Sequence, residues 1–133
     1  MNVESIYPAD WQETRGFYSP AKKIDCGYFY LIFVSGQQCH KDENHNAWTD
    51  DVEAQTEEVF QSIENILQAA GASINDVVKA QIFLTDMNDF AKVCAIRDKW
   101  FAEARPVSTL VEVNGMTRKG AKIEIEVTAV VRK

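Results

Sequence analysis

The stretch KIEIEVTAVV, residues 122–131, constrains the fold of this chain more than any other segment. Apolar Ile123, Ile125, Val127 and Ala129 alternate with Glu124, Glu126, Thr128 and Val130. Successive side chains of a strand point to opposite faces of its sheet, so the alternation predicts one face in a hydrophobic core. The other face carries two carboxylates, and they need a different environment.

Further strands are predicted over residues 28–34, 77–84 and 107–113, and the alternating strand over 121–131. An Asp25-Cys26-Gly27 turn joins two early strands that precede the first helix. The element order is therefore strands, helix, strand, helix, strands, which predicts an α+β fold. Right-handed crossovers would place both helices on one face of a mixed β-sheet.

The first helix is expected to begin at Asp50, an N-cap residue with Glu53 three positions later as in a capping box. Gly71 is expected to end it in the left-handed conformation. Its apolar stripe comprises Val52, Val59, Ile63, Ile66, Leu67 and Ala70.

The second helix is predicted over residues 88–102. Helical spacing places Phe90, Val93, Cys94, Arg97, Trp100 and Phe101 on one face. We expect Arg97 at the margin of that face, with its aliphatic stem packed and its charge in water.

Composition limits the classes of function. A chain of 133 residues, 46% of them hydrophobic, predicts a single domain over 1–133. The net charge of −6 and the absence of any basic run longer than Lys22-Lys23 or Arg118-Lys119 disfavour nucleic acid as a partner. No apolar run is long enough to cross a membrane, so we expect a soluble protein. Three cysteines without a paired spacing, and no secretion signal, favour a reducing cytoplasm.

The segment YFYLIFVSGQ, residues 28–37, is apolar on both sides of a strand. The sheet face opposite the helices is then polar or covered by another chain, and this segment favours the second alternative. An oligomer is expected, with clefts between subunits where small-molecule sites commonly form.

Five motifs follow one another in a characteristic order: FVSGQ (33–37), IENILQAAGAS (63–73), VVKAQIFLTDMNDF (77–90), STLVEV (108–113) and KIEIEVTAVV (122–131). Over about residues 15–131 the chain resembles the Rid (reactive intermediate deaminase) family, also called YjgF-type and formerly L-PSP-type endoribonucleases. The resemblance implies a chorismate-mutase-like fold and a homotrimer with sheets packed inward and three clefts between subunits. For the deaminase branch it implies hydrolysis of enamines and imines derived from amino acids, as by 2-iminobutanoate/2-iminopropanoate deaminases, without metal or organic cofactor.

One departure from the family concerns the arginine that holds the substrate carboxylate. In the deaminase branch a Pro-Ala-Arg-Ser turn supplies it, and its planar fork suits a carboxylate. Here Ser108 stands at that position, and Arg105 lies three residues upstream. Arg105 could compensate, but we favour an exposed arginine interacting with the dipole of the preceding helix. Cys94, where that branch tends to have asparagine, also indicates an arginine-lacking subgroup.

Other site residues carry over by position. Tyr18 could form a wall of the cleft or be a half-buried strand tyrosine. Ser35 and Gly36 could line the cleft or mark a bend at the end of a strand. Glu124 matches the carboxylate that positions water, or is a solvated strand residue, and Glu126 could be its partner. Leu110 joins the substrate-binding set as part of STLVEV. The catalytic hypothesis assigns water positioning to Glu124, a hydrogen bond from Ser108 to a substrate without a free carboxylate, and cleft closure to Tyr18.

The segment CHKDENH, residues 39–45, gathers metal-capable side chains without rigid spacing, so we interpret it as a solvated loop and expect no metal. Two alternatives to the deaminase remain. One is a catalytically divergent ligand-binding or regulatory trimer. The other, an endoribonuclease or translation inhibitor, fits poorly with the acidic charge.

Overall fold

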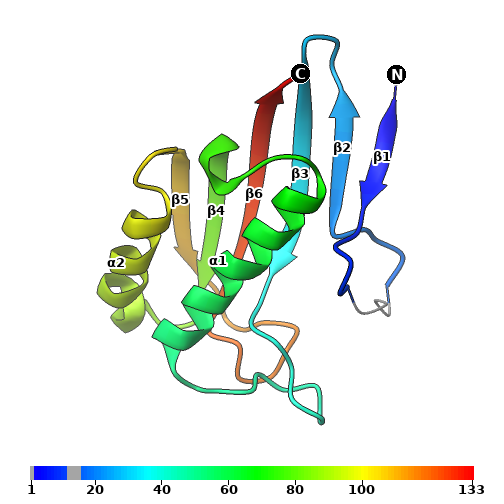
Figure 1. The fold of residues 1–133 in the computed structure, drawn as a ribbon. Helices are drawn as coiled ribbons and strands as arrows, with labels where there is room; N and C mark the ends of the chain where they lie inside the picture. The colour runs from blue at the N-terminus through cyan, green and yellow to red at the C-terminus, as the bar shows by residue number, and fades with distance from the viewer. Residues whose placement is uncertain (1, 12–15) are drawn as a thin grey trace.

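The computed structural model describes residues 2–11 and 16–133 and shows a six-stranded sheet with two helices on one face (Figure 1). The elements are β1 Val3–Ile6, β2 Ala21–Asp25, β3 Phe29–Gln37, α1 Val52–Ala69, β4 Val77–Leu84, α2 Phe90–Trp100, β5 Val107–Glu112 and β6 Ile123–Arg132. Two short 3-10 turns, Ile74–Asp76 and Met87–Asp89, precede β4 and α2. The predicted α+β fold is confirmed.

The strand order is β1-β2-β3-β6-β4-β5, so the last strand of the chain lies inside the sheet. β6 is antiparallel to both β3 and β4, and β4 is parallel to β5. The two helices thus serve as crossovers, α1 from β3 to β4 and α2 from β4 to β5. We predicted two strands before the first helix, and the structure has three, because four residues at Val3–Ile6 give too short a pattern to recognise.

The alternation in β6 builds the core. Ile123, Ile125 and Ala129 are 0% exposed and Val127 is 3% exposed. They face α1, whose stripe is also buried: Val52, Val59, Phe60, Ile63, Ile66 and Leu67. The predicted inward face of β6 and the predicted stripe of α1 are both confirmed. Together they form the hydrophobic core between the sheet and α1.

The start of α1 corrects our prediction by one residue. Asp51, not Asp50, is the N-cap, because its carboxylate accepts hydrogen bonds from the backbone N–H groups of Glu53 and Ala54. Glu53 therefore falls one position too early to complete a capping box. The end is as predicted: Gly71 has φ +82°, and the N–H of Ala72 donates to the carbonyl of Leu67 at 2.8 Å.

The second helix is shorter than predicted, since Asn88 lies in a 3-10 turn and Phe101 is the C-cap. Phe90, expected on the buried face, is 45% exposed, whereas Ile96, which we had not assigned, is 6% exposed. At the other end of this face, Phe60 of α1, which we had not assigned, stacks on Trp100 with ring centroids 5.5 Å apart and meets Phe101 edge-on at 5.2 Å.

Among the described residues, no helix combines the length and the apolar character needed to cross a membrane.

A buried amide joins the helix layer to the loops at one end of the sheet. Gln55 of α1 is 0% exposed. Its Nε2 donates to the carbonyls of Thr49 at 2.7 Å and Gly120 at 3.0 Å, and its Oε1 accepts the N–H of Lys122 at 2.8 Å. One side chain thus fixes the loop before α1 and the loop that leads into β6.

We expect Gln55→Met, which keeps the side-chain length but removes the buried amide, to lower the free energy of unfolding by about 2–4 kcal/mol, because three backbone groups lose their hydrogen-bond partner. Gln61 is a matched control, since its exposed amide bonds to the side chain of Asn65, one turn along the same helix. Gln61→Met should stay within about 0.5 kcal/mol of the wild type in chemical denaturation. Equal losses in the two variants would contradict the role given to Gln55.

Candidate functional site

The backbone of β3 is irregular where the FVSGQ motif lies. The register between β3 and β6 shifts between Val34 and Gln37, so Ser35 and Gly36 occupy a bulge. A Cβ built on Gly36 would lie 2.7 Å from Oε2 of Glu124. Glycine at this position therefore allows the Glu124 carboxylate to rest directly on the β3 backbone.

The Glu124 carboxylate is half-buried on the sheet face opposite the helices, which we call the open face. Nε2 of Gln38 donates to its Oε1 at 2.7 Å, and the same amide lies 2.9 Å from Oγ1 of Thr117. Gln38 was not among the site residues predicted from the sequence. Its position directly after the Ser-Gly-Gln motif is the signal that could have suggested it.

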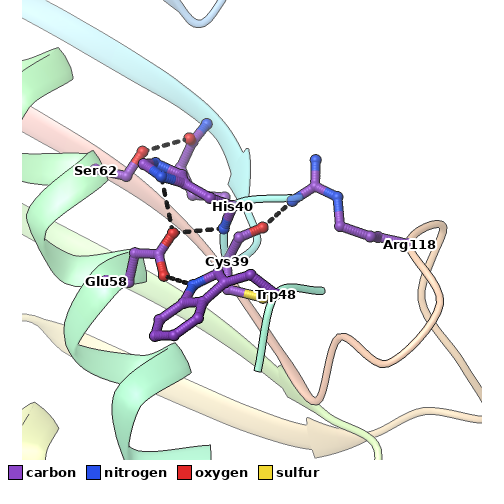
Figure 2. A network of polar contacts seen from close by, with 7 residues as sticks. Cys39, His40, Trp48, Glu58, Ser62 and Arg118 are labelled. Carbon is purple, nitrogen blue, oxygen red and sulfur yellow. Dashed lines mark hydrogen bonds and ion pairs between the residues drawn. The ribbon is translucent and has the colours of Figure 1, made fainter. Parts of the chain in front are cut away.

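The segment that carries Gln38 is fixed by a network of polar contacts (Figure 2). Oγ of Ser62 in α1 donates to Oε1 of Gln37 at 2.8 Å, and Nδ1 of His40 lies 3.0 Å from Oε1 of Glu58. Glu58 also accepts the indole N–H of Trp48. The helix layer thus holds the chain on either side of Gln38, and with it the hydrogen bond to Glu124.

Arg118 completes this network from the loop between β5 and β6, where its guanidinium donates to the carbonyl of Cys39 (Figure 2). Burial, followed by the nearby Glu58 carboxylate, raises the pKa of the Cys39 thiol. Cys39 is 0% exposed, which argues against a nucleophilic role.

Asp42 of the CHKDENH segment has local backbone partners. Asp42 accepts from the backbone N–H groups of Asn44 and Asn46, as in a local turn. Within residues 2–11 and 16–133, no group of three or more His, Cys, Asp and Glu side chains could hold a metal ion.

A cavity of about 1060 Å³ opens beside the bulge on the open face. Tyr18 and Ser35, both expected in the site, line it, and Oγ of Ser35 donates to the carbonyl of Ser19 at 2.8 Å. The carboxylate that lines this cavity is Glu126, which is exposed. Glu124 lies two residues further along the same face of β6, beside Gly36.

Ser108 and Leu110 lie on the other side of the sheet. In the parallel register between β4 and β5, Ser108 pairs with Ala80 and Leu110 with Ile82, and both partners are buried under the helices. Glu124 instead pairs with Phe83 on the open face. One protomer therefore does not bring the Ser108 hydroxyl and the Glu124 carboxylate to a common site.

Arg105 is exposed and turns back on the preceding helix. It has φ +45°, its N–H donates to the carbonyl of Phe101 at 2.9 Å, and its Nε donates to the carbonyl of Ala102 at 3.3 Å. The guanidinium thus interacts with the carbonyl of Ala102, just beyond the C-terminal end of α2, where the helix dipole favours a cation. Cys94 of the same helix is half-buried, and burial raises the pKa of its thiol.

Comparison with known proteins gives consistent results. The family model for Endoribonuclease L-PSP matches residues 12–131. A RutC family protein of Pyrococcus abyssi is 39% identical over 97% of this chain and 98% of its own length. The 2-iminobutanoate/2-iminopropanoate deaminase of Salmonella typhimurium is 37% identical over 77% of this chain and 80% of its own. The crystal structure of Rv2704 from Mycobacterium tuberculosis, a member of the YjgF/YER057c/UK114 family, superposes with a TM-score of 0.82 at 30% identity, covering 98% of this chain and 100% of that one.

The contact between Gly36 and Glu124 predicts a specific coupling. Gly36→Ala should lower the free energy of unfolding by about 1 kcal/mol, because the new methyl displaces the carboxylate and breaks its hydrogen bond to Gln38. The same change in a Glu124→Ala background should cost much less, as a double-mutant cycle in urea would show. Gly115→Ala is the control, since its Cβ would meet nothing within 4 Å. Equal costs of Gly36→Ala in both backgrounds would contradict the contact.

Proposed function

The chain belongs to the YjgF/endoribonuclease L-PSP family, and on that premise we propose that it hydrolyses reactive imines or enamines derived from amino acids. The observation that carries the proposal is the Glu124 carboxylate, seated on Gly36 and held by Gln38 beside a cavity on the open face. The similarity to a 2-iminobutanoate/2-iminopropanoate deaminase supports this reaction class.

The reaction requires only a positioned water molecule and a group that transfers its proton. An imine carbon is already electrophilic, so a water oxygen can add to it while the C=N electron pair takes a proton at nitrogen. The resulting carbinolamine then loses ammonia as its C–N bond breaks and its O–H becomes a carbonyl. Glu124 accepts a hydrogen bond from the attacking water and its proton, and returns that proton to nitrogen. The reaction needs neither a metal nor an organic cofactor, and we place it in the cytoplasm.

The proposal includes a homotrimer with the open faces inward. Large apolar side chains remain uncovered on this face in one protomer: Phe33 is 46% exposed, Val111 40% and Val107 70%. Burying such surface is the usual driving force for subunit association. In this arrangement a neighbouring protomer brings the start of its β5 strand, with Ser108, to the cleft that contains Glu124.

One observation favours a second candidate function. Because Arg105 interacts with the end of α2, the side chain expected to hold a substrate carboxylate is engaged elsewhere. A trimer that binds a small molecule without converting it would fit that geometry. The net charge of −6 disfavours RNA as the molecule bound or cleaved.

Ammonia release from 2-iminopropanoate generated in situ tests the deaminase against the binding protein. We expect Glu124→Gln to lower kcat/KM at least about 100-fold, because the neutral amide cannot accept the proton of the water. Glu103→Gln, in the exposed turn after α2, should match the wild type. Arg105→Ala should change kcat/KM by less than about threefold, since its side chain bonds to the carbonyl of Ala102 at the end of its own helix.

Three experimental outcomes would each contradict a part of this proposal. A wild type that binds 2-oxo acids without releasing ammonia supports the binding protein instead. Full activity in Glu124→Gln removes Glu124 from the mechanism. Loss of activity in Arg105→Ala places Arg105 in the cleft after all.

A further inference from the structure

The two oxygens of the Glu124 carboxylate have different surroundings. Oε1 accepts the hydrogen bond from Nε2 of Gln38 at 2.7 Å, whereas Oε2 has no partner within the described part of the chain and lies 2.7 Å from a Cβ built on Gly36. The buried unpaired side-chain nitrogen and oxygen atoms of the described residues are Nε1 of Trp11 and Oε1 of Gln38, so Oε2 of Glu124 is open to solvent. The protein thus caps one carboxylate oxygen and leaves the other free to meet a water molecule.

The orientation of the Gln38 amide follows from its neighbours. A carboxylate only accepts hydrogen bonds, so the amide must turn its NH2 group, which has two donors, toward Oε1 of Glu124. The second donor goes to Oγ1 of Thr117 at 2.9 Å. Both amide hydrogens are therefore engaged, and turning the amide over would set its carbonyl oxygen against the carboxylate.

This orientation leaves one acceptor of Gln38 without a donor. Its Oε1 is buried and has no hydrogen-bond partner among residues 2–11 and 16–133. An unsatisfied buried acceptor lowers stability, and each such exception in a native protein calls for an explanation. Gln38 leaves that acceptor unmet while it holds the Glu124 carboxylate, which is the pattern expected where a functional site overrides a local rule.

Thr117 can orient the amide because its loop is anchored. The guanidinium of the next residue, Arg118, donates to the carbonyl of Cys39, which directly follows Gln38 (Figure 2). Two contacts therefore join the segment after β3 to the loop before β6, one between side chains and one to the backbone. The exposed hydroxyl of Thr117 thus has a defined position beside the amide.

The cap on Oε1 selects the oxygen of Glu124 that carries the proton. When the attacking water adds to the imine carbon, one of its O–H bonds breaks and a new O–H bond forms at the open Oε2. The neutral carboxyl group keeps its carbonyl at Oε1, which still accepts the hydrogen bond from Gln38. Oε2 then returns the proton to nitrogen, the C–N bond breaks and ammonia leaves. The side chain passes through both charge states without a change of partner.

We propose that Gln38 and Thr117 are positioning residues for the hydrolysis, and that Oε2 of Glu124 is the oxygen that carries the proton. Gln38 acts on Glu124 directly, and Thr117 acts through the Gln38 amide. The inference rests on the proposed function and deepens it, because it assigns the proton transfer to one oxygen and names the side chains that select this oxygen.

Ammonia release from 2-iminopropanoate by the full-length protein tests the two positioning roles. Gln38→Met keeps the side-chain length but removes both donors. We expect it to lower kcat about tenfold with KM within about twofold of the wild type, because the substrate still binds but the base is misplaced. Thr117→Val removes only the hydroxyl and should lower kcat about threefold, whereas Thr117→Ser, which keeps the hydroxyl, should retain most of the rate. In a Gln38→Met background, Thr117→Val should have no further effect.

Gln68 supplies a matched control. Its amide also donates to a carboxylate, Oε1 of Glu64 at 3.0 Å, but on the exposed side of α1. Gln68→Met removes the same kind of hydrogen bond away from the site and should match the wild type in both kcat and KM.

NMR measures the two hydrogen bonds without turnover. The side-chain NH2 group of Gln38 gives two hydrogen signals, which are assigned with Gln38→Met. Glu124→Ala should shift mainly one of these signals and Thr117→Val mainly the other, because each hydrogen has its own acceptor. Signals that move in neither variant would overturn the arrangement.

The kinetic and NMR results separate the two proposals. A wild type that releases ammonia, together with an unchanged kcat in Gln38→Met, overturns the positioning role and leaves the deaminase standing. An equal effect of Thr117→Val with and without Gln38 overturns the role of Thr117. A wild type that releases no ammonia overturns the deaminase and the proton transfer at Oε2, while two separate NMR shifts would still support the cap on Oε1.

Discussion

The strict alternation of β6 is the constraint on which both the core and the candidate site depend. Its inward residues, Ile123, Ile125, Val127 and Ala129, are at most 3% exposed and pack under α1. Because β6 lies between β3 and β4, burial of this face fixes its register on both sides. A slip of one residue would exchange the buried isoleucines for the carboxylates. The energy that buries the isoleucines therefore also sets where Glu124 and Glu126 stand.

Contacts on the helix side of the sheet help to position the Glu124 carboxylate on the open face. Glu58 and Ser62 of α1 anchor the segment that follows the β3 bulge, and Arg118 holds the same segment from the loop before β6. Gln38 lies within this segment and points to the open face, where it meets Glu124. The carboxylate is thus positioned by a helix on the opposite side of the sheet, through contacts that form no part of the cavity. Such support is what gives a functional group a defined position.

Periodicity predicted the layers well and the local details less well. Hydrophobic spacing was enough for the presence of both helices and for the inward face of β6, and a glycine sufficed for the Gly71 terminus, since each depends on the chain near it. The buried face of α2 was predicted wrongly at Phe90 and missed Ile96. The N-cap moved from Asp50 to Asp51 because two adjacent aspartates offer equivalent caps and only the helix register chooses between them. β1 was missed because four residues carry too little pattern. Gln38 was out of reach for another reason: its role arises from a contact with Glu124, 86 residues away in sequence.

In the proposed trimer, β5 of a second protomer completes the site. Ser108 lies on the helix side of one protomer and Glu124 on the open face, so they can share a cleft only when two protomers meet. Mixing two inactive variants measures this directly: Glu124→Gln and Ser108→Trp are unfolded together in equal amounts, refolded and assayed for ammonia release. Random trimers should recover about a quarter of the wild-type rate, because one cleft in four combines an intact Glu124 with an intact Ser108. No recovery above the separate variants, or full activity of Ser108→Trp alone, would contradict it.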